Sequence, residues 1–177
     1  MIGARTTLAR LARRQLPMVS ALAAVLVDLA PLPDAAPHSL FPLATPMVTF
    51  HWALRRPDLF TPLSFLLVGL VLDAAGGLPL GTTGLALLAA AALVHGRERV
   101  LLAQPPLLLW GAFALFLAVF EGVRWSVVGL WHGLEARPLG PLLGEYLITV
   151  SVQPLMGPLL APLERWVGRI RHATGSR

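Results

Sequence analysis

The chain lacks cysteine entirely, which excludes disulfide bonds, thiolate metal sites and a cysteine nucleophile. Lysine is absent as well, so all 14 basic residues are arginine. Charge is scarce: 13% of the 177 residues are charged, about half of the roughly 25% that is usual in a soluble domain. We therefore expect lipid rather than water to surround most of this chain.

The sequence also lacks the common patterns of catalysis and cofactor binding. Its five histidines are scattered: no two have metal-ligand spacing, and no acidic residue accompanies them at H-E-x-x-H spacing. We find no serine nucleophile arrangement, no Walker motif and no dinucleotide fingerprint. The sequence predicts a protein that is not an enzyme and that carries no cofactor and no metal.

Long apolar stretches dominate what is present, with 56% hydrophobic residues and a mean hydropathy of +0.72. The pattern predicts an all-α membrane protein, one polytopic domain over 1–177 with six transmembrane helices in one bundle. A basic segment (1–15) precedes the spans and a basic tail (164–177) follows them; the spans are 16–32, 39–54, 60–75, 78–94, 105–130 and 139–163. The 78–94 span is the weakest, and a re-entrant hairpin is its alternative. We expect no signal-peptide cleavage after the first span.

Arginine placement supports this topology. With a cytoplasmic N-terminus, 12 of the 14 arginines fall on the inner side, and only Arg124 and Arg137 lie at or beyond the outer side. The pattern predicts that both termini are cytoplasmic. Trp52, Trp131 and Trp166 fall near predicted span ends, where amphipathic rings prefer to lie. The net charge of +5 is explained by these arginines, so we expect contact with the lipid bilayer and no nucleic-acid partner.

The final span contains prolines at every fourth position, Pro154, Pro158 and Pro162. Each proline removes a helical hydrogen bond and clashes with the preceding turn. The pattern predicts that this span is kinked or ends early on the inner side. A tilted helix end and a hinge or partner-facing notch are both compatible with it.

Residues Gly69–Leu85 place an aspartate at the end of one apolar run and glycines before the next. We expect Gly76 and Gly77 to allow a tight turn and Pro79 to occupy the first turn of the following helix. The Asp73 carboxylate is placed to accept hydrogen bonds from amides at that helix's N-terminus. A structural cap is one interpretation, and contact with a partner or substrate is the other.

Other charged residues lie within the apolar runs. Glu121 and Arg124 are three residues apart, on one helical face, as a candidate ion pair. Glu145, at the start of the sixth span, is an alternative partner for Arg124. Intramembrane charges are functional candidates, but such a pair is also able to neutralise itself in the bundle interior. Asp28, late in the first span, is expected to be hydrated near the outer interface.

The stretch from Pro42 to Leu85 resembles the family of the bacterial rod shape-determining protein MreD. The resemblance rests on a proline in the second span, the link Arg55-Arg56-Pro57 and a G-L-x-x-D-x-x-x-G-x-P-L-G signature. The signature residues are Gly69, Leu70, Asp73, Gly77, Pro79, Leu80 and Gly81. The size, the six-span topology and a proline in the last span followed by arginine also fit the family.

The resemblance implies a non-enzymatic scaffold of cell elongation in the bacterial inner membrane. Its partners would be a bitopic protein like MreC and, more widely, MreB-like filaments and the peptidoglycan synthases of lateral wall growth. Family members also resemble the six-helix substrate-binding subunits of vitamin transporters, which gives the alternative function. A transporter subunit should hold a polar pocket near its outer side, formed by Glu121, Arg124 and Glu145, whereas a scaffold should be packed there.

Overall fold

The computed structural model describes residues 2–30, 42–132 and 139–172, with side chains over 15–30, 42–131 and 139–165. The described chain is helical and contains no strand, which confirms the all-α prediction. Its elements are α1 (Ile2–Asp28), α2 (Ala44–Arg55), α3 (Pro62–Gly76), α4 (Thr82–Val94), α5 (Glu98–Leu102), α6 (Pro106–His132), α7 (Leu139–Val152), the 3₁₀ turn η3 (Gln153–Leu155) and α8 (Met156–His172).

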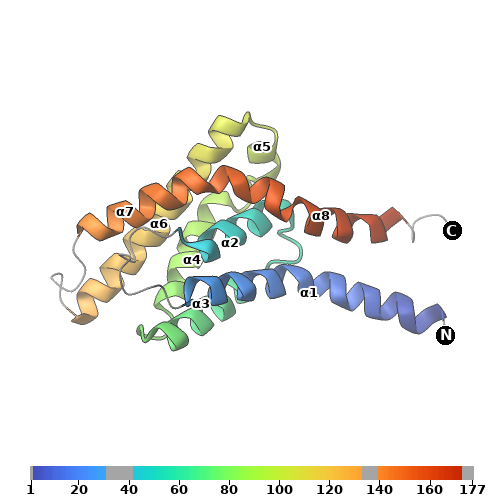
Figure 1. Ribbon diagram of the computed structural model, residues 1–177, viewed down its shortest axis with the longest axis horizontal. Coiled ribbons are helices and arrows are strands. Elements are labelled where there is room, and N and C mark those ends of the chain that lie inside the picture. Colours follow the sequence, from blue (N-terminus) through green and yellow to red (C-terminus); the bar gives the residue numbers. More distant parts are fainter. Residues whose placement is uncertain (1, 31–41, 133–138, 173–177) are drawn as a thin grey trace.

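The short helix α2 forms the centre of the molecule. All of its residues from 45 to 54 are buried, as expected for a helix that is enclosed on every side. It contacts α1, α4, α6 and α8, while α4 packs between α3 and α6 (Figure 1). The N-terminal end of α1 and the C-terminal end of α8 lie at the same end of the molecule (Figure 1).

Aromatic side chains fill the core around α2. The Phe50 ring meets Phe113 and Phe116 of α6 edge-on, with ring centroids 5.2 Å apart in both pairs. Trp52 is fully buried and its Nε1 donates a hydrogen bond to Ser20 Oγ at 2.7 Å. Trp52 therefore faces the protein interior, because its indole N–H finds a partner there. Trp131 is 73% exposed, and Trp166 lies outside the described side chains.

Two helical stretches are long and apolar enough to cross a membrane, Pro106–Trp131 and Leu139–Arg165. Three further apolar helices are shorter: Gln15–Asp28, Pro62–Gly76 and Thr82–Val94. At about 1.5 Å per residue, the 12 residues of α2 span only about 18 Å, against about 30 Å for a bilayer core. Six crossings therefore remain a prediction.

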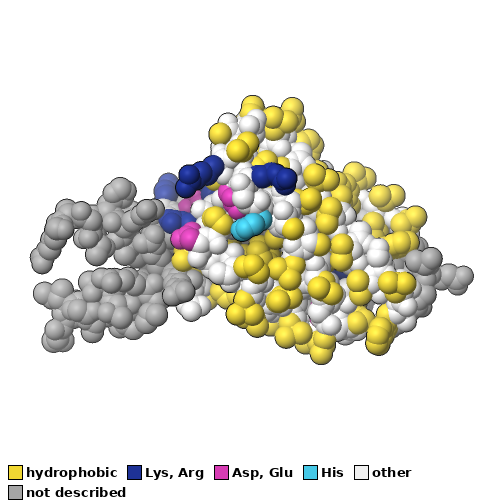
Figure 2. All heavy atoms as spheres, turned by 180° about the vertical axis from the view of Figure 1, so that it is seen from behind, with side chains coloured by type: hydrophobic (Ala, Val, Ile, Leu, Met, Phe, Trp, Pro, Cys, Tyr) yellow, Lys and Arg dark blue, Asp and Glu magenta, His cyan; other side chains and the backbone are white. Residues whose placement is uncertain are grey.

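The outer surface agrees with an apolar environment. On the face in Figure 2, the charged side chains gather mainly in one region, and hydrophobic side chains are spread over much of the rest. Several large hydrophobic side chains of α3 and α7 are exposed, among them Leu63, Leu67, Leu143 and Leu147. Such a surface needs a lipid or protein cover.

Element boundaries depart from the prediction at several places. α1 joins the basic segment and the first span into one helix, because leucine, alanine and arginine are all good helix formers. The short helix α5 lies in the link before the fifth span and was not predicted. The last span is interrupted by η3 at Pro154, as predicted, but it does not end early, since α8 continues to His172. Pro158 falls in the first turn of α8, where a missing N–H breaks no helical bond.

Candidate functional site

The Asp73 carboxylate joins the end of α3 to the start of α4. Its side chain is fully buried. Oδ2 accepts the Gly81 N–H at 2.9 Å, and both oxygens accept the Thr83 N–H, at 3.0 and 3.1 Å. These hydrogen bonds confirm the predicted cap, which satisfies amides that the first turn of a helix leaves open.

The turn itself is built by two glycines. Gly77 has φ +68° at the end of α3, and Gly81 has φ +94° at the start of α4, a region that favours glycine. Gly76, in contrast, has no positive φ. The placement predicted for Pro79 is wrong: α4 begins at Thr82, whose N–H and Oγ1 both donate to the Pro79 carbonyl, at 3.1 and 2.7 Å.

Gly69 is required by the close approach of α3 and α4. A Cβ added there would lie 2.2 Å from the Gly84 nitrogen and 2.8 Å from the Thr83 carbonyl carbon. The two backbones are thus in direct contact. Leu70 and Leu80 of the same signature are 43% and 70% exposed, so they contribute little to the core. The sequence pattern does not indicate the role of Gly84. Its contact with Gly69 depends on how α3 and α4 pack on either side of the turn.

Arg124 lies near both acidic residues of the predicted polar cluster. Arg124 Nη1 lies 3.5 Å from Glu121 Oε1, and the two side chains are 13% and 2% exposed. The guanidinium carbon lies 5.9 Å from the centroid of the Phe120 ring. Arg124 and Glu145 line the same cavity, of about 210 Å³, together with Asp28. Arg124 thus contacts Glu121 and lines the same cavity as Glu145.

Asp28 is not simply hydrated, contrary to expectation. Its Oδ1 accepts the Ala44 N–H at 2.6 Å and its Oδ2 accepts the Thr45 N–H at 2.9 Å. It thereby caps α2 from the end of α1, just as Asp73 caps α4 from the end of α3. Its position in the sequence gives no such indication, because Asp28 lies 16 residues before Ala44 along the chain.

A cluster that the sequence did not suggest joins α2 to α8. His51 Nε2 lies 2.6 Å from Glu164 Oε1, and Arg55 Nη1 donates to Glu164 Oε2 at 3.0 Å. His51 and Arg55 are one turn apart on α2, a spacing visible in the sequence. Glu164, however, follows more than a hundred residues later, and only the folded chain brings it to them.

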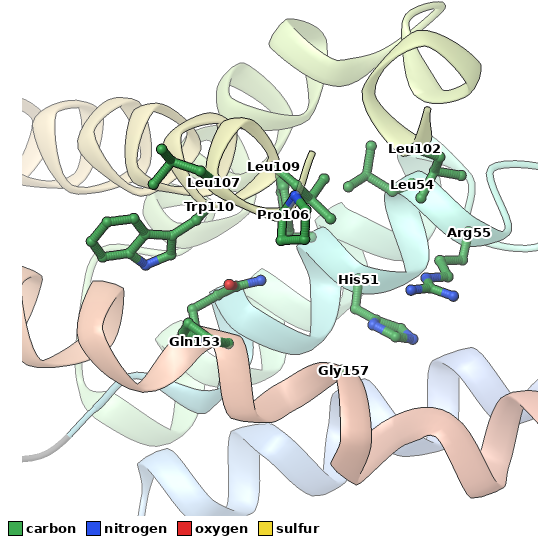
Figure 3. A pocket seen from close by; sticks show the side chains of 12 residues that line it. His51, Leu54, Arg55, Leu102, Pro106, Leu107, Leu109, Trp110, Gln153 and Gly157 are labelled. Carbon is green, nitrogen blue, oxygen red and sulfur yellow. The ribbon is translucent and has the colours of Figure 1, made fainter. Parts of the chain in front are cut away.

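His51 and Arg55 border a cavity of about 390 Å³ between α2, α6 and the η3 turn. Figure 3 shows His51 and Arg55 on one side of it and Leu107 and Trp110 of α6 on the other. Trp110 is held by a hydrogen bond of 2.7 Å from its Nε1 to the Val150 carbonyl. Among the described residues, no group of three or more histidine or acidic side chains is arranged to hold a metal ion.

The chain matches no protein-family profile, no characterised protein and no solved structure. Any family assignment therefore rests on the residues between Pro42 and Leu85 and on the geometry given above.

Proposed function

We propose that this protein is a non-enzymatic scaffold of bacterial cell elongation, of the MreD type, in the inner membrane. The observation that carries the proposal is the α3–α4 hairpin. Gly69, Asp73, Gly77 and Gly81 of the signature all serve to build it, by close contact, capping and positive φ. Residues that build a rigid hairpin, rather than an open reactive group, suit a protein that holds others in place.

The outward face of α3 supplies the docking surface in this proposal. Leu63, Leu67, Leu70 and Val71 lie on it at helical spacing and are between 43% and 62% exposed. A single transmembrane helix of an MreC-like bitopic protein would pack against these side chains. MreB-like filaments and peptidoglycan synthases would join the complex through that partner.

Depletion in a rod-shaped host tests the scaffold function. We expect rounded, widened cells, and vitamins added to the medium should not restore the rod, because no solute is being delivered. Leu67→Gln with Leu70→Gln should reduce co-purification of the bitopic partner, whereas Leu143→Gln with Leu147→Gln on α7 should not. A depleted strain that keeps its rod shape but requires a small molecule for growth would overturn the proposal.

The cavity lined by Asp28, Arg124 and Glu145 favours a second candidate, the substrate-binding subunit of a small-molecule transporter. It places two of the three charged side chains expected for such a subunit, Arg124 and Glu145, in an otherwise largely apolar wall. Mild-detergent purification from native membranes, followed by mass spectrometry, separates the two. Elongation proteins are expected from the scaffold, and an ATPase module with a coupling subunit from the transporter.

A further inference from the structure

The cavity beside His51 and Arg55 has the form of a site for an amphiphile. Its volume of about 390 Å³ lies within the range of about 300–1,000 Å³ that is usual for ligand pockets. Most of the lining is apolar, including Phe50, Leu107 and Trp110. The polar lining side chains are His51, Arg55 and Gln153.

A second cleft, of about 590 Å³, adjoins this cavity. Leu54, Arg55 and Leu102 line both spaces, so these three side chains form a common wall. The second cleft is bordered by three arginines, since Arg56 and Arg99 join Arg55 there. The apolar cavity thus continues into the second cleft, whose arginines form a basic rim.

Two acidic groups near the rim have polar partners of their own. Glu98 Oε1 accepts the Gly96 N–H at 2.8 Å and lies 3.7 Å from His95 Nδ1. Glu164 is held between His51 and Arg55. Three arginines and two acidic side chains, Asp58 and Glu98, line this cleft, so its formal charge is +1. The rim favours an anion.

We propose that these two spaces bind one anionic phospholipid. Its phosphate lies against Arg56 and Arg99, and one of its acyl chains enters the apolar cavity between α2, α6 and η3. Arginine provides charge-assisted hydrogen bonds to phosphate, and the cavity gives the chain an apolar surround. The site is independent of whether the protein is a scaffold or a transporter subunit.

Native mass spectrometry of the purified full-length protein tests the headgroup. Offered equal amounts of phosphatidylglycerol and phosphatidylcholine, the protein should retain phosphatidylglycerol. Arg56→Gln with Arg99→Gln should weaken this retention roughly thirtyfold, since each of the two basic residues near an anionic lipid contributes about 1 kcal/mol. Arg97→Gln is the matched control, because Arg97 is exposed, lies outside the cleft and donates to the Leu93 carbonyl.

Filling the cavity tests the acyl chain. Gly157 lines the cavity, and a Cβ added there meets no atom within 4 Å, so that Gly157→Leu adds bulk without a clash at that atom. It should lower phosphatidylglycerol retention several-fold. Gly111→Leu is the control, since Gly111 is exposed, also has open space around its Cβ and does not line the cavity.

A melting experiment on the unaltered protein gives an independent reading that does not depend on any variant. Added phosphatidylglycerol should raise its melting temperature and phosphatidylcholine should not, because a ligand that binds only the folded state stabilises it. Equal retention of the two lipids, or full phosphatidylglycerol retention by either the arginine variant or a folded Gly157→Leu protein, would overturn the proposal.

Discussion

At the scale of single residues, two aspartates, Asp28 and Asp73, each cap the N-terminus of the next described helix. The residues that precede α2 and α4 are Leu43 and Gly81, and neither provides a side-chain cap. Asp28 and Asp73 supply the missing acceptors from the preceding described helices. Short helices gain the most from such caps, because a larger share of their amides lacks an internal partner.

We expect Asp73→Ala to destabilise the protein more than Asp28→Ala does. Losing a cap costs about 0.5–2 kcal/mol, and the fully buried Asp73 also leaves buried amides without an acceptor. Thermal unfolding in detergent, followed by tryptophan fluorescence, measures the difference. Asp58→Ala, an exposed position, should leave the melting temperature unchanged. A smaller loss for Asp73→Ala than for Asp28→Ala would contradict this ranking.

Gly69→Ala should disrupt the hairpin. The added methyl group would meet the backbone of α4 at 2.2 Å, so the two helices must separate, at a cost of about 1–3 kcal/mol or more. Gly76→Ala is a matched control on the same helix, because its Cβ meets nothing within 4 Å. Comparing the melting temperatures of both variants measures the effect, and equal values would show that α3 and α4 are not in backbone contact.

The residues of the candidate site were predictable where they are close in sequence. The Asp73 cap follows from a carboxylate placed shortly before the next helix, and the Glu121–Arg124 pair from helical spacing. The His51–Glu164 contact and the Gly69–Gly84 approach were not, because each depends on how two helices cross. Sequence spacing along one helix says nothing about that crossing.

At the scale of elements, α2 differs most from expectation. Its apolar run predicts a span, yet the helix is short and buried on every side. A fully apolar segment is compatible with lipid around it or with protein around it, and the sequence pattern does not separate the two. The helical class and the interruption at Pro154 were predictable, since both follow from local composition.

The hydrogen bond between Trp52 of α2 and Ser20 of α1 is testable by mutation of both partners. Trp52→Phe removes the donor to Ser20 Oγ, and Ser20→Ala removes the acceptor. Each should cost about 1 kcal/mol from the hydrogen bond, with Trp52→Phe losing more through reduced packing. In a double-mutant cycle of melting free energies the two losses should be less than additive. Strict additivity would mean that the hydrogen bond contributes nothing.

At the scale of the whole molecule, the prediction is six crossings with both termini in the cytoplasm. Reporter fusions after residues 35, 57, 78, 97, 136 and 177 should read alternately outside and inside, beginning outside. The reason is the bias of arginine toward one side. An outside signal at residue 97 would rule out this arrangement and favour the re-entrant alternative for 78–94.

The caps that Asp28 and Asp73 provide to α2 and α4 also bear on the order in which contacts form during synthesis. Asp28 is synthesised before α2, and Asp73 is synthesised before α4. Each carboxylate is therefore already part of the chain when the helix that it caps is made. Glu164 reverses this order, because it reaches α2 only when nearly the whole chain has been made. Until then His51 and Arg55 lack this carboxylate. The contact between α8 and α2 is therefore among the last that the growing chain is able to make.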